Sequence, residues 1–201
     1  MNISIGIDEA GLGPLAGPVV VGVVALPEDA DLRGVTDSKK MSAEQREAAV
    51  DRIWNAALFY RVILSTAPTI DCHGPSYVWQ HMIREVAMAA HALYPASEII
   101  LDGNRLVGLP YVRPVVKADS KVRSVAAASV LAKYAQCCWM DDYHLEYPQY
   151  GFDRHHGYGT ALHLEMLKEH GPCPIHRMSF APVKRAIRSK SSSRPCGSRR
   201  A

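Results

Sequence analysis

The sequence predicts a single α/β domain in which a mixed five-stranded sheet is flanked by helices. Apolar runs rich in β-branched residues mark the strands, and runs with helical periodicity lie between several of them. Such alternation is typical of α/β proteins. The first two strands follow each other without a helix, so we expect them to pair antiparallel. The later strands, which are reached through helices, are expected to be parallel.

The expected strands are short and apolar, and they cover 2–7, 19–26, 59–65, 99–101 and 112–116. In the first strand Ile3, Ile5 and Ile7 alternate with smaller or polar residues and share one face. Its end is marked by two acids and then by a glycine-rich turn, which separates it from the second strand. This opening stretch combines carboxylates with exposed backbone amides, and it is the first candidate site.

The expected helices have apolar positions three and four residues apart, and they cover 42–57, 76–93, 122–143 and 161–170. Ser42 with Gln45 predicts a capping box, and Ser76 is expected to cap the second helix. The prolines in 68–75 predict a loop there, and 148–160 is expected to be a loop rich in Tyr, His and Gly. Small residues at 126–129 predict close packing of the third helix against the sheet.

Composition argues for a soluble cytoplasmic protein, and we expect it to act as a monomer. No apolar run reaches the ~18 residues of a membrane span, and the N-terminus lacks the basic and apolar regions of a secretory signal. The five cysteines are odd in number and form no CxxC pair, so reduced thiols in the cytoplasm are expected.

Positive charge is concentrated near the C-terminus. Residues 187–201 hold five bases and no acid, whereas the remainder holds 18 Lys and Arg against 20 Asp and Glu. We therefore expect a catalytic domain over 1–186 and a basic, Ser/Arg-rich disordered tail over 187–201. The tail has a second interpretation, as a tether for nucleic acid.

Four acids end three different strands, and they are Asp8, Glu9, Asp102 and Asp119. Ligands of open α/β sheets bind at the carboxyl ends of strands, so neighbouring strands would bring these carboxylates together. Like charges in one place raise one another's pKa unless a cation compensates them. Oxygen ligands without a His–Cys pattern favour Mg²⁺ or Mn²⁺ over zinc.

Gly11 to Ala16 also fits the dinucleotide-binding pattern G-x-G-x-x-A. That pattern requires a helix directly after the glycines, so that a pyrophosphate lies at its N-terminus. Here Pro14 and Gly17 lead into a strand instead, and two acids precede the turn. This alternative is therefore the weaker one.

At this point the chain resembles the ribonuclease HII family, the type 2 ribonucleases H. The matching segments follow the family order, and they are GIDEAG (6–11), GPLAGPVVVG (13–22), TDSKKMS (36–42), LDGN (101–104), KADSK (117–121), AAASVLAK (126–133), YPQYGF (147–152), HHGYGT (155–160) and PIHRMSFAPV (174–183). The resemblance implies a ribonuclease H-like three-layer fold. It also implies cleavage of RNA in RNA–DNA hybrids, and incision 5′ of ribonucleotides embedded in duplex DNA, with 5′-phosphate and 3′-hydroxyl products.

The resemblance also implies roles for particular residues. The four acids take the places of the metal-binding catalytic residues. Gly11 and Gly13 lie in the turn whose amides read the 2′-hydroxyl, and Tyr158 lies against the ribonucleotide junction. Ser38, Lys39 and Lys40 would lie along the phosphate backbone.

The chain departs from the family where substrate would bind. The turn is normally Gly-Arg-Gly, whereas this chain has Leu12 between the glycines, so a charge-assisted phosphate contact is absent. Gln136 and Cys137 replace a usual Arg-Asp pair. These changes leave open a second interpretation, a weakened or inactive paralogue that binds hybrids. The intact quartet of acids opposes it.

Overall fold

The computed structural model describes residues 2–35, 38 and 41–192. Its centre is a five-stranded sheet in the order β3-β2-β1-β4-β5. The strands are β1 (Ile3–Ala10), β2 (Val19–Pro27), β3 (Phe59–Ser65), β4 (Ile99–Asp102) and β5 (Val112–Val115). The α-helices are α1 (Ala43–Ala56), α2 (Ala67–His73), α3 (Pro75–Leu93), α4 (Arg123–Glu146), α5 (Phe152–His155), α6 (Ala161–His170) and α7 (Ala181–Ser192). The expected mixed five-stranded sheet is confirmed.

The sheet places β1 at its centre. β1 pairs antiparallel with β2, as expected, and parallel with β4, which in turn pairs parallel with β5. The expectation of parallel pairing is wrong for β3, which runs antiparallel to β2. β1 also extends further than expected: Asp8 pairs with Gly22 and Glu9 with Val21, so both acids lie inside the strand.

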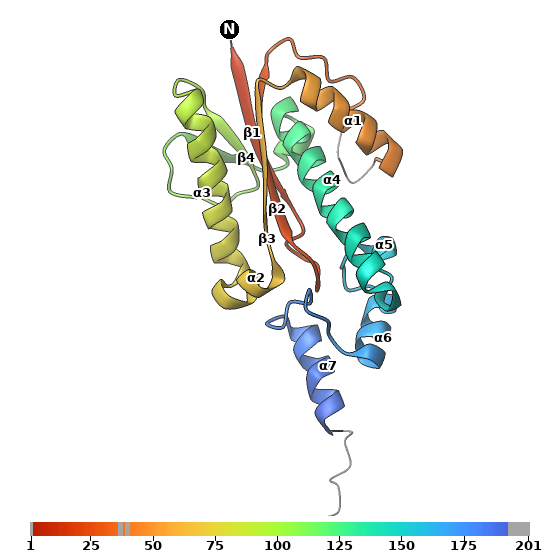
Figure 1. Ribbon diagram of the computed structural model, residues 1–201. Coiled ribbons are helices and arrows are strands. Elements are labelled where there is room, and N and C mark those ends of the chain that lie inside the picture. The colour runs from red at the N-terminus through yellow and green to blue at the C-terminus, as the bar shows by residue number, and fades with distance from the viewer. Residues whose placement is uncertain (1, 36–37, 39–40, 193–201) are drawn as a thin grey trace, which may run out of the picture.

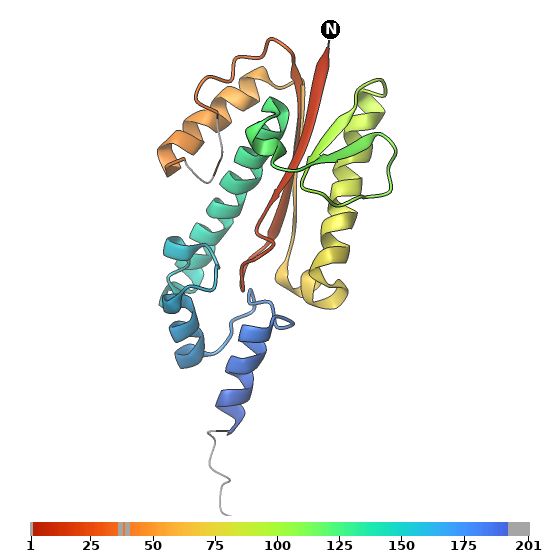
Figure 2. The same ribbon diagram turned by 180° about the vertical axis from the view of Figure 1, so that it is seen from behind.

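Helices cover both faces of the sheet, with α3 on one side and α1 and α4 on the other (Figures 1 and 2). On the α3 side, Ile5 and Ile7 belong to the largest apolar cluster, together with Trp79 of α3. On the α4 side the packing is closer, as the small residues at 126–129 predict. A Cβ atom added at Gly6 would lie 2.2 Å from the backbone of Val125, and one at Gly22 would lie 2.8 Å from the Ala128 carbonyl. Gly6 and Gly22 thus allow α4 to approach the sheet.

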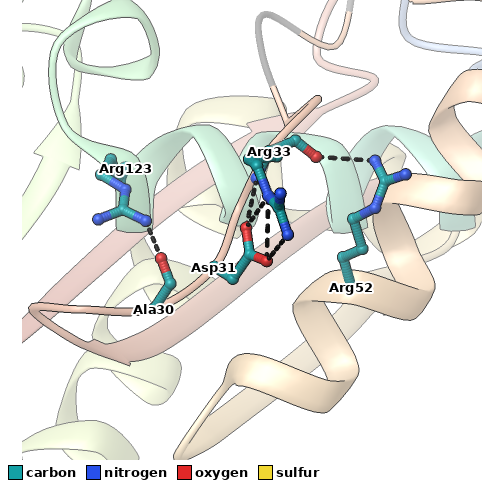
Figure 3. A network of polar contacts seen from close by, with 5 residues as sticks. All are labelled: Ala30, Asp31, Arg33, Arg52 and Arg123. Atoms are coloured by element: carbon teal, nitrogen blue, oxygen red, sulfur yellow. Dashed lines mark hydrogen bonds and ion pairs between the residues drawn. The ribbon is translucent and has the colours of Figure 1, made fainter.

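A polar network secures the loop between β2 and α1 (Figure 3). Arg123, at the start of α4, donates to the Ala30 carbonyl, and Arg52 of α1 donates to the Arg33 carbonyl at 2.7 Å. Arg33 also forms an ion pair with Asp31 at 2.7 Å, and both side chains are largely exposed. The network joins this loop to two helices just before the segment that carries Ser38.

The capping box at Ser42 and Gln45 is confirmed. The loop expected over 68–75 is wrong, because α2 occupies most of it. Ala67 and Ile70 of α2 are buried, and this burial outweighs the local proline signal. Gly74, with φ of 83°, separates α2 from α3. As a result α3 begins at Pro75, with Gly74 rather than Ser76 at its N-cap.

The C-terminal segments gather at the end of the sheet where β1 stops (Figures 1 and 2). The Leu15 amide donates to the Gly157 carbonyl, and Ala16 forms a bridge with His176. Residues 187–192, expected to belong to a disordered tail, are the end of α7 instead, and 193–201 lie outside the described residues. Within the described ranges no helix combines the length and apolar character needed to cross a membrane.

Candidate functional site

Asp8 lies on the α4 side of β1 and is 6% exposed. The pKa of its carboxyl is raised to about 8, first by burial and then by the nearby charges of Glu9 and Asp102, against the lowering effect of a hydrogen bond with Ser129. The Glu9 amide also donates to Asp8 Oδ1 at 2.8 Å. A buried carboxylate beside two others is a group that a cation would stabilise in its charged form.

Glu9 contacts the opposite helical layer. The indole Nε1 of Trp79 on α3 donates to Glu9 Oε2 at 3.1 Å. The guanidinium of Arg105 lies over the same indole ring, 5.2 Å from its centroid. Consecutive residues of a strand point to opposite faces, which explains why the two neighbouring acids have different helical partners.

Asp102 ends β4, directly beside β1, because Ile7 pairs with Leu101 in the parallel register. Asp102 Oδ1 accepts a hydrogen bond from the Ala118 amide at 2.7 Å. Asp119 follows Ala118 in a short 3₁₀ turn, η2 (Ala118–Ser120), beyond the end of β5. The structure thus brings the four acids to the same end of three neighbouring strands, as the sequence predicts.

The carboxylates are not gathered around one point. Among the residues described, no three His, Cys, Asp or Glu side chains stand close enough together to hold one metal ion as placed. The hydrogen bonds to Asp8, Glu9 and Asp102 come from Ser129, Trp79 and Ala118, which lie on different elements. The chemistry of the donors nevertheless fits a hard divalent cation, since all of them are carboxylate oxygens and one has a strongly raised pKa.

A cavity of about 210 Å³ opens beside Asp8 and Glu9. Its lining combines acids, the glycine turn, two serines, one base and one aromatic residue, and the residues are Asp8, Glu9, Ala10, Gly11, Leu12, Gly13, Ser38, Ser129, Lys133 and Tyr158. Seven of these residues are predicted from the sequence. Asp102 and Asp119 do not line it.

The glycine turn has one residue that must be glycine and one that need not be. Gly11 has φ of 87°, and an added Cβ would lie 2.5 Å from the Pro18 carbonyl oxygen. At Gly13 an added Cβ would meet only Cε1 of Tyr158, at 3.7 Å. Leu12 between them is half-buried and packs against the apolar cluster of the α3 face. A methyl group at Gly13 would therefore fit in ordinary van der Waals contact with Tyr158.

The cavity holds one ammonium group in the described part of the chain, that of Lys133 on α4. Lys133 Nζ lies 5.6 Å from the centroid of the Tyr158 ring and donates to Gln136 Oε1 at 2.7 Å. Gln136 in turn donates to the His156 carbonyl at 3.0 Å. The departure from the family pattern at residue 136 thus provides an acceptor that holds Lys133 near Tyr158.

Ser38 is buried, and its hydroxyl lies 2.9 Å from that of Ser129. When Ser129 donates to Asp8, the Ser129 hydroxyl hydrogen is used, so Ser38 must donate to Ser129. Ser38 therefore orients the Ser129 hydroxyl toward Asp8, and it also lines the cavity. Lys39 and Lys40 lie outside the described residues.

Ser129, Lys133 and Trp79 were not predicted as site residues. Ser129 and Lys133 are four residues apart and so share a helix face, a signal available in the sequence once α4 is known to pack on β1. Trp79 gave no such signal, because an aromatic residue at helical spacing is ordinarily part of the core.

Comparison with known proteins decides the family. The family model "Ribonuclease HII" matches residues 5–183. The chain belongs to the ribonuclease HII family. Ribonuclease HII of Polaromonas sp. is 45% identical over 184 residues, which cover 91% of this chain and 92% of the relative. The protein is therefore an enzyme, a ribonuclease H that hydrolyses RNA in RNA–DNA hybrids.

Solved structures of relatives share the fold. The crystal structure of ribonuclease H2 from Pyrococcus horikoshii is 26% identical with a TM-score of 0.70, covering 93% of this chain and 98% of that one. RNase HII in the PCNA complex from Archaeoglobus fulgidus is 26% identical with a TM-score of 0.74, covering 89% of this chain and 95% of that one. The expected ribonuclease H-like fold is thereby confirmed.

Proposed function

We propose that this ribonuclease HII, besides cleaving the RNA strand of hybrids, incises duplex DNA on the 5′ side of an embedded ribonucleotide, with a divalent metal held by Asp8, Glu9, Asp102 and Asp119. The products are a 5′-phosphate and a 3′-hydroxyl. The observation that carries the proposal is the cavity in which two of the acids meet the glycine turn. A site for ribose beside a site for phosphodiester hydrolysis is what such a reaction requires.

The glycine turn supports recognition of ribose. In the described part of the chain, the N–H groups of Leu12 and Gly13 donate to no protein acceptor. The two residues line the cavity, so these donors can bond a 2′-hydroxyl, the group that distinguishes RNA from DNA. Tyr158 lines the same cavity beside Gly13, where its ring can stack on the sugar or base at the junction.

The carboxylates support a metal-dependent reaction. Mg²⁺ or Mn²⁺ prefers carboxylate oxygens, and a cation would offset the burial and the repulsion from Glu9 that together raise the pKa of Asp8 to about 8. When bound, the metal would lower the pKa of an attacking water and neutralise charge at the phosphate. Lys133 would neutralise a neighbouring phosphate, because its ammonium group lies in the same cavity. All of these groups come from one chain, so we propose that the protein acts as a monomer.

Cleavage of defined duplexes tests the proposal. Three labelled duplexes are incubated with the protein in Mg²⁺, in Mn²⁺ and in EDTA: one with a single ribonucleotide, one with a long RNA strand opposite DNA, and one of DNA alone. We expect the first two to be cut in at least one metal, no cutting in EDTA, and no cutting of DNA alone. Binding without cleavage in either metal would instead favour the inactive paralogue.

A further inference from the structure

Arg177 is the largest fully buried side chain of the described residues, and it lies in the segment between α6 and α7. Burial lowers the pKa of its guanidinium to about 10, so it stays charged at neutral pH. Among the described residues no carboxylate forms an ion pair with Arg177. A buried cation needs compensating partners, so its hydrogen bonds indicate what it does.

Within the described residues, all the hydrogen bonds of the Arg177 side chain go to carbonyls at the two ends of the loop that joins β1 to β2. Nη2 donates to the Gly11 carbonyl at 2.6 Å, and Nη1 donates to the Leu12 carbonyl at 3.0 Å. At the other end of this loop, just before β2, Nε and Nη2 donate to the Gly17 carbonyl at 3.2 and 3.0 Å, and Nη2 donates to the Pro18 carbonyl at 3.1 Å. The planar guanidinium therefore fixes four peptide groups at once.

These bonds determine where the amides of the turn point. In a trans peptide the carbonyl and the following N–H point in opposite directions. When the carbonyls of Gly11 and Leu12 point to Arg177, the N–H groups of Leu12 and Gly13 point away from it. Neither N–H has an acceptor in the described part of the chain, and both residues line the cavity with Asp8 and Glu9.

We propose that Arg177 is a positioning residue that sets the preference of the site for ribose over deoxyribose, by holding two amide donors toward the 2′-hydroxyl. The inference rests on the proposed function, because it assigns the orientation of the turn that reads ribose. Arg177 itself lies behind the turn and touches no substrate. The position of Arg177 is fixed in turn by its neighbours. Its amide donates to the Leu15 carbonyl at 2.8 Å, and its guanidinium lies 5.3 Å from the Phe180 ring centroid.

Binding measurements separate positioning from general stability. Affinities are measured by fluorescence anisotropy in EDTA for two duplexes of one sequence, one with a single ribonucleotide and one of DNA alone. The wild type is expected to prefer the first. Arg177→Lys keeps the positive charge but loses the planar set of guanidinium donors. The preference of this variant for the ribonucleotide duplex should therefore fall by about tenfold, which corresponds to the loss of one well-placed hydrogen bond. Affinity for DNA alone should stay within about twofold, because phosphate contacts are untouched.

Asp71→Asn is the matched control. Asp71 of α2 accepts hydrogen bonds from the amides of Met178 and Ser179 at 2.7 and 2.8 Å, so the change weakens the same segment. It also removes a negative charge that acts on the Arg177 guanidinium, but it leaves the hydrogen bonds from Arg177 to the four carbonyls in place. It should lower the melting temperature and keep the preference. If Arg177→Lys does not fold, Phe180→Leu removes the ring beside the guanidinium and should reduce the preference by a smaller factor.

Three results would overturn the inference. The first is a wild-type preference in Arg177→Lys, or in Phe180→Leu in its place. The second is an equal loss of affinity for both duplexes in Arg177→Lys, which indicates a purely structural role. The third is a loss of preference in Asp71→Asn as large as that in Arg177→Lys. A wild type that neither cleaves nor prefers the ribonucleotide duplex contradicts the proposed function itself, so the two failures are distinguishable.

Discussion

A methyl group added at Gly11 should affect stability, whereas one added at Gly13 should affect substrate binding. Gly11→Ala forces φ of 87° on a residue with a Cβ and a 2.5 Å approach to the Pro18 oxygen, so it should lower the free energy of unfolding by about 1–3 kcal/mol. Gly13→Ala makes only a 3.7 Å contact with Tyr158, so it should fold normally while filling the space proposed for ribose. Urea unfolding and duplex binding distinguish them. A Gly13→Ala variant with wild-type affinity for the ribonucleotide duplex would contradict this assignment.

Trp79 should affect the reaction through Glu9. Trp79→Phe retains an aromatic ring in the core and removes the Nε1 donor that holds the Glu9 carboxylate. We expect kcat to fall by about tenfold, the value of one hydrogen bond to a charged group, with KM for the duplex unchanged. Steady-state kinetics measure this. Trp54→Phe, at an exposed residue of α1, is the control and should leave kcat unchanged. Equal kcat values for the two variants would remove Trp79 from this role.

Leu12→Arg should restore a phosphate contact at the turn. Leu12 lines the cavity but is half-buried against apolar side chains, so the change should cost some stability and add one cationic contact. The slope of log affinity against log salt concentration should steepen by about one unit. Titrations at several salt concentrations measure it. An unchanged slope would show that position 12 does not face phosphate.

At the scale of elements, two buried histidines join α6 to the segment before α7. His163 Nδ1 must donate to the Tyr158 carbonyl at 2.9 Å, and His176 Nδ1 must accept from the Cys173 amide at 3.0 Å. The bond between their Nε2 atoms, at 3.1 Å, then runs from His176 to His163 with both rings neutral. A further proton on either ring would oppose one of these bonds, and burial lowers both pKa values to about 4.

The histidine pair predicts a loss of stability in acid. In the unfolded chain the two histidines take up protons near pH 6.5, whereas in the folded chain they stay neutral until about pH 4. Their contribution to the free energy of unfolding is therefore complete above pH 6.5 and is lost as the pH falls toward 4. Each ring contributes on the order of 3 kcal/mol to this difference. His163→Asn keeps a donor for Tyr158 and should flatten the dependence of unfolding free energy on pH. A variant whose dependence equals that of the wild type would contradict the prediction.

The elements that the sequence predicts best are those whose own residues determine them. β2 is apolar throughout and α1 carries a complete capping box, and both appear nearly as expected. α2 was missed, because Pro68 within it and Pro75 just beyond it indicate a loop, while the burial of Ile70 and the anchoring by Asp71 depend on distant segments. The extension of β1 through Glu9 similarly depends on pairing with β2. Such pairing is a tertiary effect that local propensity does not contain.

At the scale of the whole molecule, the sheet order determines the site. Because β1, β4 and β5 are neighbours and run parallel, the acids that follow or end them lie at the same edge of the sheet, as the sequence predicts. The sequence could not predict which face each acid takes, or that Arg177 reaches back across about 160 residues to the turn. Both depend on how the helical layers and the C-terminal segment pack against the sheet end (Figures 1 and 2).

The most direct test of the account is to map the cut in a duplex that contains one ribonucleotide, for the wild type and for Asp102→Asn. The change removes a charge beside Asp8 but keeps an oxygen that can accept from the Ala118 amide, so the fold should persist. The account predicts a single cut on the 5′ side of the ribonucleotide by the wild type, and bound but intact duplex with Asp102→Asn. Cutting by Asp102→Asn at the wild-type rate, or a cut elsewhere by the wild type, would contradict it.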